Sequence, residues 1–414
     1  MALTTEVLVV GGGVAGLASA WHLARAGREV LVVESAEQPG VHSSGQNAAI
    51  LRSLIADVDL TRIGRAAAER LHRPPAGFAD TPLVRPHGLV LAADPAGREA
   101  LLAWPDTMPA PPYPECRAEV LTARELERVL PPFAPLLDPG DGFDDPVALY
   151  LPDEGELDVA ALVEAFATGA RSASSVGGRD ARILCGAEVA RLATDPTSGA
   201  VTGVELRDGR RVVADQVLLA SGAWAGAMAA EVGSPMAFAP KRRTLAVGLS
   251  SGPPVDATWP VVWNQGTDFY ARPESGGMLL CGCDETLLEP AGPPSAGGCP
   301  RDEAALELVA ERTALFLPAF ADARVGSFWS GWRTFTETGD ASDGRHPFAI
   351  GPDPAVPSLF WAAGLGGHGM TSSFEVGRLA AVAVLEARGQ RLPAELEGED
   401  YGSAFLPRAA ATPA

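Results

Sequence analysis

Short apolar runs alternate with stretches of helical periodicity along this chain of 414 residues. Near the N-terminus, residues 7–10 form a β-branched apolar run, residues 14–26 repeat apolar side chains at helical spacing, and residues 30–33 form a second apolar run. This order predicts a strand, a helix and a second strand. The same patterns predict strands at residues 88–91, 201–206, 211–219, 261–263, 269–271, 278–281, 329–335 and 359–363, and helices at residues 122–129, 159–171, 303–316 and from about 370 to about 388.

Glycines occupy the turn between the first strand and the helix, in the order Gly11-x-Gly13-x-x-Gly16. Gly11 permits a tight turn, Gly13 permits close approach of a pyrophosphate to the backbone, and Gly16 permits the helix to pack on the strand. The second strand ends at Glu34, where an acid can hold ribose hydroxyl groups. The unit therefore predicts dinucleotide binding at the helix N-terminus, and the alternative is a plain packing turn.

The apolar patterns also assign segments of the chain to two domains. The helix at residues 159–171 marks a return to the first domain after one departure, and a second departure begins near Pro240. We therefore predict a two-domain α/β protein, in which a Rossmann-like domain is interrupted twice by a mixed, largely antiparallel β-rich domain. The predicted pieces are residues 1–80, 149–236 and 334–414 for the first domain, and residues 81–148 and 237–333 for the second.

The charge balance and the cysteines limit the classes of partner. The chain carries 52 acidic and 32 basic residues, a formal net charge of −20, which disfavours binding to nucleic acids and to anionic membranes. Its five cysteines are an odd number without CxxC or metal-ligand spacing, so we expect reduced thiols in a cytoplasmic protein and no metal site. No apolar run approaches the roughly 18–20 residues that span a bilayer, so we expect no membrane span.

Six short motifs make the chain similar to a known family. They are PGVHSSG at residues 39–45, PKRR at 240–243, DFY at 268–270, GWR at 331–333, FWAAG at 360–364 and GGHG at 366–369. With these motifs the chain resembles, over essentially its whole length, the superfamily of FAD-dependent D-amino-acid oxidases, glycine oxidases and sarcosine oxidases. Within that superfamily it is most similar to the FAD-dependent D-arginine dehydrogenases. The resemblance implies an FAD-binding domain, a β-rich substrate domain and an amino-acid substrate between them.

The resemblance also assigns FAD to residues of the first domain. Glu34 would hold the adenosine ribose, Val189 would contact adenine, and the last glycine-rich loop would lie beside the flavin, where a helix N-terminus stabilises negative charge. Arg333 stands where sarcosine oxidases carry the cysteine that attaches FAD, so we expect non-covalent FAD. The residues implied in cofactor binding are Gly11, Gly13, Val14, Ala15, Gly16, Glu34, Ser35, His42, Ser43, Ser44, Gly45, Ala48, Ala49, Val189, Ala220, Gly222, Trp224, Gly366, Gly367, His368, Gly369, Met370 and Thr371.

Five residues are candidates for the substrate site. The resemblance implies that Arg333 and Arg243 clamp a carboxylate, which a planar guanidinium binds through two hydrogen bonds, with Tyr270 in the same pocket. Salt bridges are the alternative for these arginines, and packing is the alternative for the tyrosine. His368 is a candidate base or a loop cap, and Arg52 matches a carboxylate-binding arginine of sarcosine oxidases or is a solvated lid charge.

The chain departs from its relatives at positions that select the substrate. Residues 85–89 lack the glutamate that pairs with the side chain of D-arginine, and Ile50 and Ile55 replace the histidine and tyrosine of the lid loop. The three arginines and several apolar residues fit an acidic or an apolar substrate side chain better. The apolar run at residues 278–281 lacks the lysine that sarcosine oxidases keep for reaction with oxygen, which favours a dehydrogenase or a slow oxidase.

The resemblance implies an FAD-dependent amino-acid dehydrogenase or oxidase. Hydride would pass from Cα of an amino acid, in the first instance a D-amino acid, to flavin N5, and the imine would hydrolyse to a 2-oxo acid. Oxidation of N-alkyl amino acids such as sarcosine, or of 2-hydroxy acids, is the first alternative, and an FAD-carrying subunit of an electron-transfer complex is the second. The electron acceptor, O2 or a quinone or other carrier, stays open.

Overall fold

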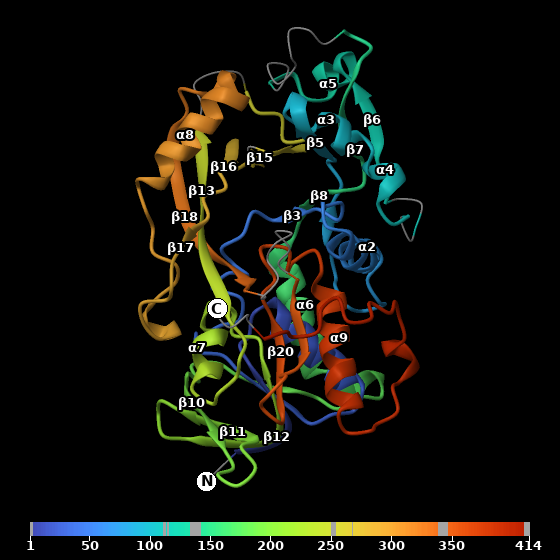
Figure 1. The fold of residues 1–414 in the computed structure, drawn as a ribbon. Helices are drawn as coiled ribbons and strands as arrows, with labels where there is room; N and C mark the ends of the chain where they lie inside the picture. The colour runs from blue at the N-terminus through green and yellow to red at the C-terminus, as the bar shows by residue number, and fades with distance from the viewer. Residues whose placement is uncertain are drawn as a thin grey trace.

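The computed structural model describes residues 3–110, 113, 116–132, 142–249, 254–266, 268–337 and 347–409. Within these residues, two large sheets lie at opposite ends of the molecule, and the long strand β13 (Phe238–Leu249) runs from one end towards the other (Figure 1). Between them, a small sheet has the order β3 (Ile50–Leu51), β8 (Gly155–Leu157) and β4 (Val84–Arg85).

The first sheet has parallel strands at its centre. Its order is β10 (Val189–Thr194), β11 (Val201–Leu206), β12 (Arg211–Leu219), β1 (Leu3–Val10), β2 (Val30–Val33) and β9 (Arg182–Leu184), and β12 also pairs with β20 (Leu359–Ala363), which pairs with β19 (Ala349–Pro352). Val10 of β1 lies opposite both Leu219 of β12 and Val33 of β2. The carboxyl ends of these three strands therefore meet at one edge of the sheet.

The alternation of side chains along β1 creates a core on each face of this sheet. Val7 and Val9 belong to one cluster and Leu8 and Val10 to the other, as the two-residue period of a strand requires. The first cluster is covered by helices α1 (Val14–Arg25), α2 (Val58–His72), α6 (Val159–Arg171) and α9 (Ser373–Glu386). The second cluster is covered by the strands β10 and β11 and by helix α7 (Ala225–Ala230).

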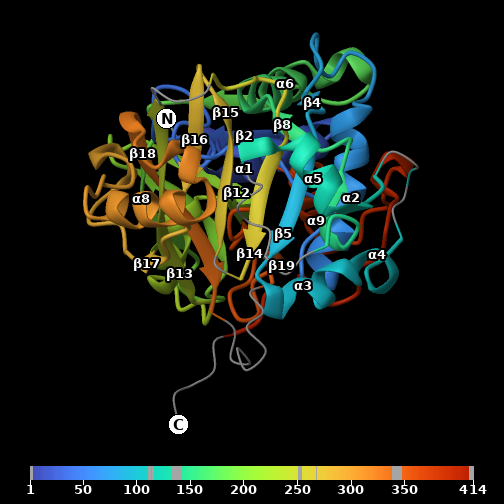
Figure 2. The ribbon, with the colours of Figure 1, turned by 90° about the horizontal axis from the view of Figure 1, so that it is seen from above.

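The second sheet is mixed and mostly antiparallel. Its order is β17 (Thr286–Leu287), β13, β16 (Gly277–Cys281), β15 (Phe269–Glu274), β14 (Val261–Gln265), β5 (Leu89–Ala93), β7 (Pro146–Leu151) and β6 (Glu119–Thr122), and β18 (Arg324–Thr336) pairs with β13. Helices α5 (Ala123–Val129) and α8 (Ala305–Phe316) cover its outer face (Figure 2). Its other face, with Leu245, Tyr270 and Cys281, turns towards Ala48 of the first half of the molecule.

The remaining helices are short. They are α3 (Pro95–Leu102), α4 (Trp104–Thr107) and the 3₁₀ turns Ala173–Val176, Gly222–Trp224, Pro294–Ala296, Pro318–Phe320 and Ala394–Leu396.

The structure confirms the predicted α/β fold with a mixed β-rich second sheet. Each predicted strand and helix has a counterpart, and the errors are at the ends: β18 begins at Arg324 instead of residue 329, and α8 begins at Ala305 instead of residue 303. Helix α2 was absent from the prediction, although Asp57 caps it by accepting a hydrogen bond from the Leu60 N–H at 2.9 Å. The residue boundaries of the two domains stay a prediction.

Candidate active site

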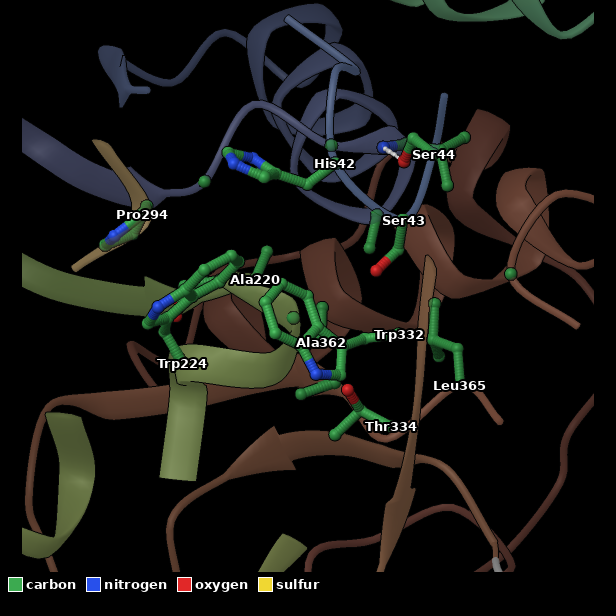
Figure 3. Close-up of a pocket in the computed structure, with 18 of the residues that line it drawn as sticks. His42, Ser43, Ser44, Ala220, Trp224, Pro294, Trp332, Thr334, Ala362 and Leu365 are labelled. Carbon is green, nitrogen blue, oxygen red and sulfur yellow. Dashed lines mark hydrogen bonds between the residues drawn. The ribbon is translucent and has the colours of Figure 1, made fainter. Parts of the chain in front are cut away.

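A large cavity opens at the carboxyl edge of the first sheet. Val10, Val33 and Ala363, which end β1, β2 and β20, all line it. Ala220, which follows β12, lines it as well (Figure 3). The cavity is open to solvent on one side, and its unfilled space, counted together with that open part, is about 1130 Å³. Ligands of open α/β sheets bind at this edge, where the strand order reverses.

The glycine-rich turn lines the cavity at positions where backbone groups pack too closely to leave room for a side chain. Gly11 has φ +108°, and a Cβ there would lie 2.5 Å from the carbonyl oxygen of Ala220. A Cβ at Gly16 would lie 2.0 Å from the carbonyl oxygen of Gly11, so helix α1 packs closely on β1. The Val14 N–H at the start of α1 donates to Ser44 Oγ at 3.0 Å, which brings the loop after β2 to the helix N-terminus (Figure 3).

Glu34 presents a fixed carboxylate to the cavity. Its side chain is 6% exposed and accepts hydrogen bonds from the N–H groups of Gly12 at 2.6 Å and Ala36 at 2.8 Å. The Ser35 hydroxyl donates to the same carboxylate at 3.0 Å. Each carboxylate oxygen accepts several hydrogen bonds, so a fixed acid at this place fits ribose hydroxyl donors.

Three aromatic side chains form another wall of the cavity. The rings of His42 and Trp224 and those of Trp224 and Trp332 meet edge to face, each pair with centroids 5.0 Å apart (Figure 3). The indole N–H groups donate to backbone carbonyl oxygens, Trp224 to Gly292 and Trp332 to Leu288, both at 2.9 Å. The two indoles are therefore held in place before any ligand binds.

The structure brings most of the predicted cofactor residues to this cavity. Those that line it are Gly11, Gly13, Val14, Ala15, Glu34, Ser35, His42, Ser43, Ser44, Val189, Ala220, Gly222, Trp224, Gly366, Gly367, Gly369 and Met370. Those outside its lining are Gly16, Gly45, Ala48, Ala49, His368 and Thr371. Gly16 and Gly45 instead pack on backbone, since a Cβ at Gly45 would lie 2.7 Å from the Gly40 carbonyl oxygen.

Sequence reasoning missed several lining residues that share a simple signal. Most of them stand near strand ends or in the loops that follow, and Met228 of α7 and Pro294 of a 3₁₀ turn are exceptions. The missed residues are Val10, Val33, Gly40, Val41, Asn47, Ala187, Ser221, Met228, Pro294, Trp332, Thr334, Ala362, Ala363, Gly364 and Leu365. The rule that ligands bind at the carboxyl ends of parallel strands points to Val10, Val33 and Ala363.

Arg333 connects the cavity to the second sheet. It lies on β18, lines the cavity and is 8% exposed. A Cβ at Gly367 would lie 3.1 Å from Arg333 Cδ, so the glycine-rich loop rests on the stem of this side chain. The guanidinium donates one hydrogen bond, from Nη1 to the Trp332 carbonyl at 3.1 Å, and no described carboxylate pairs with it. Burial lowers the pKa of Arg333.

Arg243 differs from Arg333 in having an acidic partner. It lies on β13 opposite Gly331 and is 9% exposed. Its Nη2 donates to Glu285 at 2.7 Å, and its Nε donates to the Asp284 carbonyl at 3.2 Å. The predicted clamp therefore has one guanidinium that already carries a counter-charge.

Arg52 directly follows β3 and contacts strand β14 of the second sheet. Its guanidinium lies over the Trp263 ring at 4.1 Å, and Trp263 stacks on Tyr270 with centroids 4.4 Å apart. The backbone N–H of Arg52 donates to Thr371 Oγ1 at 3.3 Å, which ties this segment to the loop before α9. Burial lowers the pKa of Arg52 to about 10. Trp263 was not among the predicted site residues.

The charges of the three arginines act on the imidazole of His368. Burial and the charges of Arg52, Arg243 and Arg333 lower the pKa of His368 to about 3, so its imidazole is neutral near pH 7. Its carbonyl accepts hydrogen bonds from the N–H and the hydroxyl of Ser372, at 3.1 and 2.8 Å, directly before α9. Of the two predicted roles, these contacts fit the loop cap.

Two further ionisable groups lie near the arginines. Glu154 is 3% exposed and accepts from the N–H of Ser53 at 2.9 Å and from its hydroxyl; burial raises the pKa of Glu154 to about 7. Burial opposes ionisation of the Cys281 thiol, but Cys283, Arg243 and Tyr270 lower its pKa to about 7. All five cysteines are free thiols. No sequence signal marked Glu154, because burial of this acid depends on distant segments.

The described residues contain no helix that is both long enough and apolar enough to cross a bilayer. Over the same part of the chain, no group of three or more histidine, cysteine, aspartate or glutamate side chains is arranged to hold a metal ion.

The sequence and the fold are similar to those of known flavin-dependent proteins. The model of the FAD dependent oxidoreductase family matches residues 6–383. Glycine oxidase from Bacillus licheniformis is 26% identical over 366 residues, which cover 83% of this chain and 84% of that protein. A D-amino acid dehydrogenase from Neisseria meningitidis is 54% identical over 43 residues, 10% of each chain. The crystal structure of glycine oxidase from Bacillus cereus has the same fold, with a TM-score of 0.71, 20% identity and coverage of 99% of this chain and 100% of that one.

Proposed function

This chain belongs to the family of FAD dependent oxidoreductases, and from that premise we propose that it oxidises the carbon–nitrogen bond of an amino acid, in the first instance a D-amino acid. The observation that carries the proposal is Arg333, a buried cation without a described acidic partner, at the junction of the cofactor cavity and the second sheet. Such a cation fits the α-carboxylate that every amino acid carries.

The residues of the cavity fit FAD. Gly11 and Gly13 leave room for the diphosphate at the start of α1, Glu34 fits the ribose, and the aromatic wall covers the side of the cavity. FAD would be held without a covalent bond, since Arg333 stands where sarcosine oxidases carry the cysteine that attaches FAD. When bound, FAD supplies an acceptor for the hydride that leaves the substrate.

The side chains around Arg333 orient the substrate. We assign the α-carboxylate to the Arg333 guanidinium, with Arg243 Nη1, which has no partner in the described chain, as a second donor. Tyr270 is held by its stack on Trp263, so it forms a rigid wall beside the two arginines. Neutral His368 does not add a fourth positive charge near the substrate amine. Held in this way, the α-carbon is fixed relative to the cofactor cavity.

The chemistry needs no protein nucleophile. The α-carbon loses a hydrogen with its electron pair, the neutral amine loses a proton, and a carbon–nitrogen double bond forms. Water then adds to the imine, and ammonia leaves with formation of the 2-oxo acid. The described residues provide binding and exclusion of water for the first step, and the second step proceeds in water.

A second candidate substrate is glycine or an N-alkyl amino acid. Glycine oxidase from Bacillus licheniformis is similar to most of this chain, and the same arginines would bind the carboxylate of a secondary amine. A 2-hydroxy acid would bind through the same carboxylate site.

Anaerobic reduction of the bound flavin tests the proposal. The purified flavoprotein is mixed with D- and L-amino acids, glycine, sarcosine and 2-hydroxyglutarate, and loss of the oxidised-flavin absorbance is followed. Rapid loss with a D-amino acid is the expected result, and a repeat in air then separates an oxidase from a dehydrogenase. Reduction by sarcosine or a hydroxy acid alone would support the second candidate. No reduction by any compound would reject the proposal in favour of an FAD-carrying subunit that relays electrons.

A further inference from the structure

The substrate side of the site holds more buried positive charge than the described carboxylates neutralise. The charges of three buried arginines, Arg52, Arg243 and Arg333, act on His368, and of these Arg243 pairs with Glu285 at 2.7 Å. Arg52 and Arg333 form no ion pair with any described carboxylate. A buried charge without a partner is costly, so these two guanidinium groups are arranged for ligands that bring negative charge.

Arg52 has the environment of a binding group. It is 6% exposed, and its guanidinium donates one described hydrogen bond, from Nε to the Leu54 carbonyl at 3.3 Å. Both Nη groups are without a described acceptor. The Trp263 ring 4.1 Å away stabilises the cation from one face, which leaves the edge of the guanidinium free for a carboxylate.

The acids nearest to Arg52 do not neutralise it. Glu154 accepts hydrogen bonds from Ser53 and is not within ion-pair distance of Arg52, and burial raises its pKa to about 7. Asp268 is exposed, so water screens its charge. The Cys283 thiol is the third group that acts on Arg52, but burial raises the pKa of Cys283 well above its usual value, so this thiol carries no charge near pH 7.

Arg52 and Arg333 also belong to one site. The loop before α9 contacts both: the Arg52 N–H donates to Thr371 Oγ1 at 3.3 Å, and a Cβ at Gly367 would lie 3.1 Å from Arg333 Cδ. Arg52 covers Trp263, Trp263 stacks on Tyr270, and Tyr270 lies within the electrostatic influence of Arg333. Arg52 therefore contacts the stacked aromatic pair directly, and both arginines contact the loop before α9.

We propose that the substrate is a dicarboxylic amino acid, whose α-carboxylate binds Arg333 and whose second carboxylate binds Arg52. The inference deepens the function proposed above and rests on it. Two carboxylates supply one negative charge to each unpaired guanidinium, and the aromatic pair supports the carbon chain between them. Oxidation at the α-carbon leaves both carboxylates intact and gives a dicarboxylic 2-oxo acid and ammonia.

The first experiment compares each acid with its isosteric amide. The FAD-loaded protein is reduced anaerobically by aspartate and asparagine, by glutamate and glutamine, each as both enantiomers, and by iminodiacetate and N-(carbamoylmethyl)glycine. We expect kcat/KM for at least one acid to exceed that of its amide by about 10- to 100-fold, the discrimination given by a charge-assisted hydrogen-bond pair.

Two arginine variants connect this preference to Arg52. Arg52→Gln should bring the ratio of acid to amide close to one, and Arg52→Lys should restore part of it. Arg301→Gln is the matched control, because Arg301 also lies over an aromatic ring of the second sheet, Phe328 at 5.2 Å, but is exposed and away from the cavity. This control should keep the preference of the wild type.

A binding measurement separates this inference from the proposed function. Succinate and its monoamide succinamate have no amine to oxidise, and their binding is followed by the shift of the flavin spectrum and by thermal stabilisation. Tighter binding of succinate, lost in Arg52→Gln, supports the second carboxylate site even if no amine reduces the flavin. Equal binding of the two compounds, together with equal reduction by acids and amides, would overturn the inference while leaving amino-acid oxidation intact.

Discussion

The two sides of the active site are built in different ways. The cofactor side is formed largely by backbone groups. Gly11 and Gly16 allow backbone segments to approach each other closely, and Glu34 is held by three hydrogen-bond donors. On the substrate side, long side chains from distant segments converge, and Arg52 and Arg333 keep buried charges without described partners. The cofactor side is satisfied within the chain, whereas the substrate side lacks negative charge until a ligand binds.

Substitutions on the two sides should therefore affect stability and activity differently. A change on the cofactor side disturbs contacts that the folded chain makes with itself, so it lowers stability and cofactor binding together. A change of an unpaired arginine removes a buried charge that the folded chain does not compensate, so it costs activity without a cost in stability. Measuring both quantities in the same variants sharpens the comparison.

The largest effect is expected for Arg333→Leu. Loss of two charge-assisted hydrogen bonds to the α-carboxylate should lower kcat/KM for flavin reduction by roughly 10²- to 10⁴-fold. The melting temperature of the substrate-free flavoprotein should not fall, because Arg333 has no described ion pair to lose. Stopped-flow reduction and thermal unfolding measure the two quantities, with Arg333→Lys as the conservative variant. A much less stable protein with unchanged substrate KM would instead identify Arg333 as a structural residue.

A smaller effect, on stability, is expected from a matched pair of glycine variants. Gly16→Ala places a Cβ 2.0 Å from the Gly11 carbonyl oxygen and should destabilise the flavoprotein by about 1–3 kcal/mol or more. Gly97→Ala, in helix α3, meets only Ala93 Cβ at 3.7 Å and should stabilise by up to about 1 kcal/mol, since alanine favours helices. Urea midpoints and retained FAD measure both. Equal effects of the two changes would show that the turn at Gly11 tolerates expansion.

The same contrast explains what the sequence could predict. The glycine turn, Glu34 and the strands on either side are consecutive in the chain, so local patterns identified them. The arginines entered only through family resemblance, and the pairing of Arg243 with Glu285 or the stacking of Arg52 on Trp263 followed from no local pattern. Such contacts depend on how β3, β13 and β14 are brought together by the packing of distant segments.

The smallest expected effect concerns two buried acids, one on the cofactor side and one on the substrate side. Glu34 accepts from Gly12, Ala36 and Ser35, whereas Glu154 accepts from Ser53 alone and its Oε2 has no partner in the described chain. Burial raises the pKa of Glu154 from 4.5 to about 7. Below pH 4.5 both the folded and the unfolded protein keep this proton. As pH rises towards 7 the unfolded protein loses it first, so stability should fall.

Between pH 5.5 and 7 this term should lower the free energy of unfolding by up to about 2 kcal/mol, near 1.4 kcal/mol per pH unit. Glu154→Gln, which cannot ionise, should lose this part of the pH dependence when melting temperatures are followed over that range. Glu156→Gln, in the same short strand β8 but half-exposed, should keep the wild-type dependence. If Glu154→Gln keeps it as well, Glu154 is ionised in the folded protein at pH 5.5. Its negative charge would then offset that of Arg52, and the substrate side would be closer to charge balance than its hydrogen bonds indicate.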